Sequence, residues 1–181
     1  MKRLAAVLAL TLAASLLAGA YGVLHDQATF TISPEYFTAF KYHQFRLADS
    51  PLPDRVKVGV IGFLATWWMG AFIAPILALA GGFFRDAATL WRETLRTILL
   101  VLAITLAFGV FAGGYGWVRT RALDPADYAG WYFPENLRRP ARFAWVGWIH
   151  NFGYLGGFIG AAFGVVRQVA RGYRSRGALA G

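Results

Sequence analysis

The sequence contains no cysteine, and only 15% of its residues are charged. The absence of cysteine excludes structural disulfides, thiolate metal sites, iron–sulfur clusters and haem attachment through a CxxCH motif. The scarcity of charge accompanies 57% hydrophobic residues, a share too high for a soluble domain of 181 residues. We therefore predict a membrane protein. The sequence has no basic module interleaved with aromatic residues, so nucleic-acid binding is not expected.

The hydrophobic residues are concentrated in four long runs that carry almost no charge. Each run reaches about 20 residues, the length that a helix needs to cross ~30 Å of hydrocarbon. Backbone groups in lipid must bond to one another, so each run is predicted to be a helix. We predict an all-α fold, a four-helix transmembrane bundle that forms a single integral membrane domain over residues 1–181. The predicted spans are about 4–24, 58–82, 97–118 and 143–166, with outer loops 25–54 and 119–142 and a basic tail, 167–181.

The N-terminus combines features of a signal peptide and of a membrane anchor. Lys2 and Arg3 precede the first apolar run, and Ala18-Gly19-Ala20 resembles a cleavage site. The run continues to Leu24, which favours a retained helix over a cleaved signal. No Lys or Arg lies between residues 25 and 39, so both termini are predicted to be cytoplasmic. Arginine outnumbers lysine 15 to 3, as in GC-rich bacterial genomes, and the predicted location is the inner (plasma) membrane of a bacterium.

The first outer loop contains the segment HDQATFTISPEYFTAFKYHQF, residues 25–45, which is polar and rich in aromatic rings. Alternating polar and apolar residues predict extended backbone at 29–32. Ser33 and Pro34 then fit the N-cap and the first position of a helix. We predict a short helix in the membrane interface that forms a lid across the outer end of the bundle. Its aromatic side consists of Tyr36, Phe37, Phe40 and Phe45.

All three histidines of the chain fall near the predicted outer face, with acids and an amide beside them. The candidate outer-face site consists of His25, Asp26, Glu35, His43, His150 and Asn151. Imidazole and carboxylate groups bind zinc, copper, manganese or non-haem iron, and two histidines can also hold a haem. The sequence has no HxxxH or HxxE spacing, so the alternative is that each histidine makes a structural hydrogen bond.

Glycines recur at helical spacing in the third and fourth predicted spans. A spacing of four residues places glycines on one face, where the backbones of two helices can approach closely. The glycines are Gly109 and Gly113 in the third span and Gly153, Gly156, Gly157, Gly160 and Gly164 in the fourth. We predict a tight contact between these two spans or with another protein.

The second outer loop carries five arginines: Arg119, Arg121, Arg138, Arg139 and Arg142. Positive charge at an outer face departs from the usual bias of membrane proteins. Either these arginines pair with Asp124, Asp127 and Glu135 in the same loop, or they bind an anionic partner. Such a partner could be a lipid headgroup, an acidic protein loop or a phosphate-bearing substrate.

The run H-D-Q-x-T-F-T-I-S-P-E-Y-F resembles one carried by small multi-pass bacterial membrane proteins of unassigned function. The resemblance covers residues 25–45 and extends towards 65–70. It implies that the outer segment is the characteristic part of these proteins, and it implies no activity.

Two functions are compatible with these features. The first is an accessory or scaffold subunit that contacts a larger membrane complex, a second copy of the chain or lipid. The second is a membrane-embedded protein that binds a metal or haem through the outer-face histidines; otherwise no cofactor is expected. A transporter is disfavoured because the predicted spans contain no Asp, Glu, Lys or Arg. An enzyme of the hydrolase class is disfavoured because the chain has neither a GxSxG motif nor a cysteine.

Overall fold

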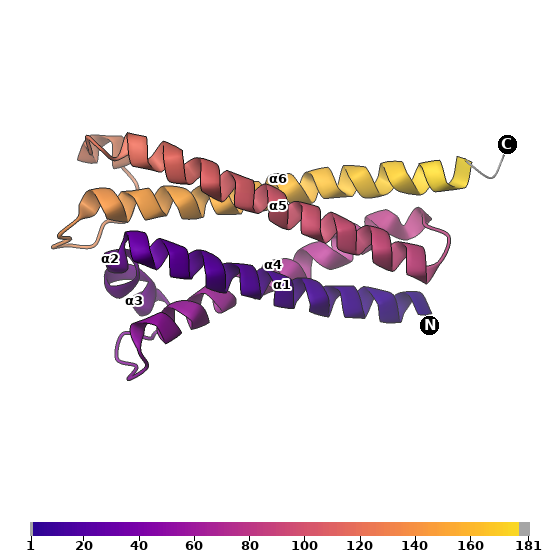
Figure 1. Cartoon of the computed structure of the whole chain (residues 1–181), viewed down its shortest axis with the longest axis horizontal. Helices are drawn as coiled ribbons and strands as arrows, with labels where there is room; N and C mark the ends of the chain where they lie inside the picture. Colours follow the sequence, from indigo (N-terminus) through magenta and orange to yellow (C-terminus); the bar gives the residue numbers. More distant parts are fainter. Residues whose placement is uncertain (1, 178–181) are drawn as a thin grey trace.

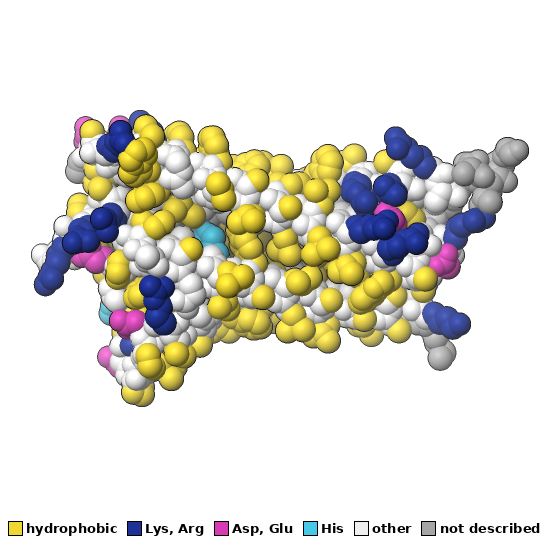
Figure 2. Space-filling model, viewed as in Figure 1, with side chains coloured by type: hydrophobic (Ala, Val, Ile, Leu, Met, Phe, Trp, Pro, Cys, Tyr) yellow, Lys and Arg dark blue, Asp and Glu magenta, His cyan; other side chains and the backbone are white. Residues whose placement is uncertain are grey.

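Residues 2–177 are described by a computed structural model, and they form an all-helical chain without a strand (Figure 1). The four long helices are α1 (Lys2–Ile32), α4 (Asp54–Ala80), α5 (Ala87–Arg119) and α6 (Pro140–Gly177). Each is long and apolar enough to cross a membrane, which confirms the predicted four-helix bundle. An apolar band covers the middle of the molecule, and the charged side chains gather at its two ends (Figure 2).

The two ends of the bundle carry different elements. One end, here called the terminal end, holds the start of α1, the end of α6 and the turn η2 (Gly81–Phe83) (Figure 1). The other, here called the lid end, holds the loop with η3 (Pro125–Tyr128) and three short turns. These turns are α2 (Pro34–Tyr36), η1 (Phe37–Lys41) and α3 (Tyr42–Gln44), and together they form the lid.

The backbones of α1 and α4 touch at two places. A Cβ atom at Gly62 would lie 2.3 Å from the carbonyl oxygen of Gly22. One at Gly70 would lie 2.2 Å from the carbonyl oxygen of Ala14. Lipid tails are as apolar as the helices, so close van der Waals packing of this kind is what holds such a pair together. The sequence pattern did not indicate this contact, because the glycines of α1 and α4 do not recur at a spacing of four.

The glycine face of α6 lies against α5, so this contact is internal to the chain. A Cβ atom at Gly156 would lie 2.7 Å from Phe108 Cβ, and one at Gly160 would lie 3.2 Å from Val101 Cγ1. Gly164 continues the same face one turn later. α5 therefore meets the glycines of α6 with larger side chains rather than with glycines of its own.

The remaining predicted glycines have other neighbours. A Cβ atom at Gly113 would meet nothing within 4 Å, so this glycine does not mark a close helix contact within the chain. The nearest atoms to an added Cβ are Met69 Cε at 3.2 Å for Gly157, Tyr21 Oη at 3.7 Å for Gly109 and His25 Nε2 at 4.0 Å for Gly153. Gly153 and Gly157 thus face the interior between α6, α1 and α4.

The helices extend beyond the predicted spans. α1 continues to Ile32, so the prediction of extended backbone at 29–32 is wrong. The hydroxyls of Thr29 and Thr31 donate hydrogen bonds to carbonyl oxygens four residues earlier, which satisfies these polar side chains within the helix. α6 likewise includes residues 167–177 of the predicted tail, whereas residues 178–181 lie outside the described residues.

The lid begins as the sequence predicts and packs onto the bundle. Ser33 Oγ accepts a hydrogen bond from Tyr36 N, and Pro34 occupies the first turn. Tyr36 and Phe37 are buried in the hydrophobic core of the lid end, together with side chains of α1, α4 and α6. The partly buried rings at the margin of this core include Phe40 and Phe45. The lid therefore covers the ends of three long helices.

We expect Gly62→Ala to destabilise the protein, because the new methyl group would collide with the backbone of Gly22 and push α1 away from α4. Overpacking of this kind costs roughly 1–3 kcal/mol of unfolding free energy. Thermal unfolding in detergent measures the loss. Gly59→Ala is the matched control, because a Cβ atom there would lie an ordinary 3.6 Å from Gln27 Nε2. Equal unfolding temperatures for the two variants would contradict the backbone contact.

Candidate metal site

Two histidines and one aspartate converge inside the lid end of the bundle. His25 and Asp26 lie on α1, and His150 lies on α6, 124 residues after Asp26. Each residue offers one ligand atom, and these atoms lie within 4.8 Å of one another. Asp26 is 4% exposed and His150 is 8% exposed. Gly153, one turn after His150, faces the His25 ring, since a Cβ atom there would lie 4.0 Å from His25 Nε2.

The hydrogen bonds of His150 leave its second nitrogen facing an acceptor. His150 Nδ1 lies 3.0 Å from Val146 O, and because a carbonyl oxygen can only accept, Nδ1 carries the proton. His150 Nε2 lies 3.2 Å from Asp26 Oδ1. In a neutral imidazole this nitrogen holds a lone pair, which would repel the carboxylate. The contact therefore requires one additional positive charge, either a proton or a metal ion.

His25 completes the pattern from the other side of the carboxylate. Its Nδ1 lies 3.1 Å from Asp26 Oδ1 and donates to it. The neutral ring then has its lone pair on Nε2, and this nitrogen is buried without a hydrogen-bond partner among the described residues. Such a buried, unpartnered acceptor is costly unless something else binds it.

A cavity of about 80 Å³ lies next to these groups. Small and apolar side chains of all four long helices form most of its wall. The polar side chains that line it are Tyr21, His25, Asp26, Lys41, Thr66, Thr105, His150 and Tyr154. This volume accommodates a few water molecules or a small ion. A haem does not fit in this conformation, since the ring centroids of His25 and His150 are 4.8 Å apart and leave no space for a porphyrin between them.

The lid closes the site from above. The Tyr36 ring stacks on the His150 ring with centroids 4.8 Å apart, and Phe37 approaches it edge-on at 6.3 Å. Burial raises the pKa of the Tyr36 hydroxyl, and the neighbouring Tyr154 and the negative charge of Asp26 add to this effect. Tyr36 therefore stays neutral, and the site is shielded by apolar rings.

Lys41, a basic residue of the lid, lines the same cavity. Its ammonium group donates a hydrogen bond to Gln44 Oε1 at 2.9 Å and lies 5.0 Å from the centre of the Phe40 ring. Burial lowers the pKa of this ammonium group, whereas the charge of Asp26 acts in the opposite direction. The site thus combines one acid with two imidazoles and one amine in a largely apolar enclosure.

The other predicted site residues lie elsewhere. His43 is exposed on α3, and Asn151 is exposed on α6. Glu35 serves a structural contact: its carboxylate oxygens accept hydrogen bonds from the backbone N–H groups of Arg138 and Arg139, at 2.7 and 2.9 Å. The carboxylate thereby fastens the second loop to the lid.

Sequence reasoning missed Tyr21, Lys41 and Tyr154 as parts of the site. A signal for the two tyrosines is present in the sequence. Tyr21 precedes His25 by four residues, and Tyr154 follows His150 by four, so each pair shares one helix face. The signal from Tyr21 was hidden because the first helix was predicted to end before His25, whereas Tyr154 and His150 both lie in the fourth predicted span.

The arginines of the second loop divide between pairing within the protein and exposure. Arg119 forms an ion pair with Asp127 at 3.3 Å, as the intraloop alternative predicts. The guanidinium of Arg121 lies 3.5 Å from the centre of the Trp117 ring. The side chains of Arg138, Arg139 and Arg142 are exposed.

We expect Glu35→Gln to loosen the second loop, because it removes the charge from the hydrogen bonds to the two backbone N–H groups. Charge-assisted bonds contribute about 1.5–3 kcal/mol, so these amides should exchange hydrogen at least about 10-fold faster. Hydrogen exchange at Arg138 and Arg139 measures the effect. Glu135→Gln, an exposed acid in the same loop, should leave the exchange unchanged. Equal exchange in both variants would show that Glu35 does not hold the loop.

Comparison of the chain with known protein families, with curated proteins and with solved structures returns no match. The functional assignment therefore rests on the chain's own residues. Its four apolar helices fit a polytopic membrane protein, and its most distinctive polar feature is the group formed by His25, Asp26 and His150.

Proposed function

We propose that this polytopic membrane protein binds one divalent transition-metal ion between α1 and α6, through His25, Asp26 and His150. The observation that carries the proposal is the lone pair of His150 Nε2 facing the Asp26 carboxylate at 3.2 Å. A metal ion between these atoms supplies the missing positive charge and binds both groups. Three ligands from two helices would then join α1 to α6.

The donor set suits zinc best. Two imidazoles and one carboxylate match the ligands of zinc sites that keep an open position, and they also suit non-haem iron. Asp26 Oδ1 lies 3.2 Å from His150 Nε2, and the ligand atoms of the three residues all lie within 4.8 Å of one another. Ligand atoms at zinc bond lengths of about 2.0–2.2 Å are separated by roughly 3.3–3.5 Å in a tetrahedron, so a small movement suffices. The fourth position would face the cavity.

An accessory or scaffold role is a second candidate, favoured by the outer surfaces of the helices. Between 28% and 33% of each span's apolar window is buried within the chain. The larger part of every span is thus free for lipid, for a second copy or for a larger membrane complex. A metal-stabilised lid end would present a rigid surface to such a partner.

We expect the purified full-length protein to bind one Zn²⁺ per chain after treatment with a chelator. Removal of a ligand by His25→Ala, Asp26→Asn or His150→Ala should weaken Zn²⁺ binding by at least about 100-fold. Substitution of residues that only support the ligands already weakens metal binding by up to about 100-fold. Isothermal titration with Zn²⁺ measures the affinity. At a free Zn²⁺ concentration 100 times the dissociation constant, binding should add about 2.7 kcal/mol to the free energy of unfolding, which is seen as a higher unfolding temperature.

His43→Ala is the matched control, because it removes an exposed histidine of the lid without touching the site. It should bind Zn²⁺ like the unaltered chain. The proposal fails if no stoichiometric ion binds, or if His43→Ala and His150→Ala lose affinity equally.

A further inference from the structure

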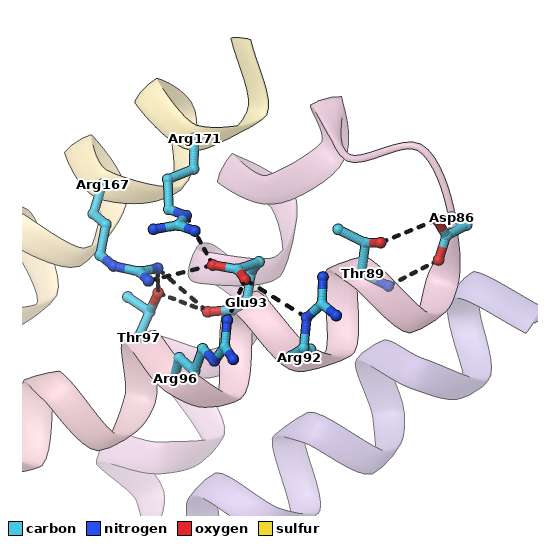
Figure 3. A network of polar contacts seen from close by, with 8 residues as sticks. All are labelled: Asp86, Thr89, Arg92, Glu93, Arg96, Thr97, Arg167 and Arg171. Atoms are coloured by element: carbon cyan, nitrogen blue, oxygen red, sulfur yellow. Dashed lines mark hydrogen bonds and ion pairs between the residues drawn. The ribbon is translucent and has the colours of Figure 1, made fainter. Parts of the chain in front are cut away.

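The terminal end contains a second polar centre, in which four arginines surround one glutamate (Figure 3). Glu93 of α5 is 4% exposed, and its carboxylate contacts guanidinium groups of α5 and α6. The nitrogen–oxygen distances are 2.8 Å for Arg96, 2.9 Å for Arg171, 3.3 Å for Arg167 and 3.7 Å for Arg92. Arg96 and Arg167 each donate a hydrogen bond to one of the two carboxylate oxygens, so both oxygens of Glu93 have a partner.

The arginines carry more charge than the nearby acids neutralise. The second acid of the network, Asp86, caps α5 by accepting hydrogen bonds from Thr89 N at 2.8 Å and Thr89 Oγ1 at 3.0 Å. Figure 3 thus contains four positive and two negative side chains. Arg174, one turn further along α6, adds another positive charge beside them. Such an excess of like charge favours binding of an additional anion.

A pocket of about 380 Å³ opens beside this network. Three guanidinium groups line it, those of Arg92, Arg171 and Arg174, and Glu93 forms part of its wall. The remaining lining residues are Phe84, Thr89 and Ser175, two of which carry hydroxyl groups. Guanidinium groups bind phosphate oxygens in pairs, whereas the two hydroxyls already donate to Asp86 Oδ2 and Gly172 O.

We infer that this pocket binds the phosphate of an anionic membrane lipid. The position favours a lipid over a soluble anion, since the cationic group adjoins the apolar band that covers the spans (Figure 2). The phosphate would lie among Arg92, Arg171 and Arg174, with the acyl chains along the apolar surface of α5 and α6. Glu93 would position Arg171 from behind, through the 2.9 Å ion pair. This inference is independent of the metal site at the lid end.

The test is native mass spectrometry of the full-length protein with phosphatidylglycerol or phosphatidylcholine added in detergent. We expect one phosphatidylglycerol to bind more tightly than phosphatidylcholine. Arg174→Gln removes a lining charge that is exposed and is not an ion-pair partner of Glu93 among the described contacts. It should weaken phosphatidylglycerol binding about fivefold, the loss typical of one basic side chain near an anionic surface. The double variant with Arg92→Gln should lose affinity further.

Arg85→Gln is the matched control, because Arg85 is exposed at the same end but does not line the pocket. It should leave the lipid affinity unchanged, and both single variants should keep the unfolding temperature of the lipid-free protein. Equal binding of the two lipids would overturn the inference, and so would an equal loss in Arg85→Gln and Arg174→Gln. A third result would also overturn the inference: inorganic phosphate binds to the lipid-free protein but does not compete with phosphatidylglycerol. The pocket would then hold a soluble anion, and the lipid would bind elsewhere.

Discussion

The carboxylate of Asp26 is the group on which the lid end depends. It is buried between two imidazoles, at 3.1 Å from His25 and 3.2 Å from His150, and it joins α1 to α6. An uncompensated buried charge would be strongly destabilising, so the site must hold a proton or a cation. The unpartnered Nε2 of His25 and the small adjacent cavity favour a metal ion. The lid covers this site, because Tyr36 stacks directly on His150.

The whole bundle follows one principle, in which α6 is held to other helices by a buried acid near each end. Asp26 contacts His150 at the lid end, and Glu93 contacts Arg167 and Arg171 at the terminal end. Between them the helices approach closely at glycines, and Thr66 of α4 donates a hydrogen bond to Ala18 O of α1. The two buried acids thus lie near the ends of the bundle, and each is compensated by basic groups, which lowers the cost of burying it.

The sequence was sufficient for the architecture but not for the site. Hydropathy predicted the four spans because the length of an apolar run is a local property, and Ser33 predicted the start of the lid for the same reason. The end of α1 was misplaced because polarity begins at His25, whereas helical hydrogen bonding continues to Ile32. The convergence of Asp26 and His150 depends on how two distant helices pack. The sequence places His150 inside a predicted span and His43 in a predicted loop, but no local pattern shows that His150 meets Asp26.

The central claim is that His25, His150 and the carboxylate of Asp26 bind one metal ion. X-ray absorption spectroscopy of the zinc-loaded protein tests this claim most directly. The account predicts a shell of nitrogen and oxygen ligands alone, at about 2.0–2.2 Å, with outer scattering from two imidazole rings. One ring should be missing in His25→Ala and in His150→Ala. A shell with no imidazole scattering, or one unchanged by these substitutions, would contradict the claim.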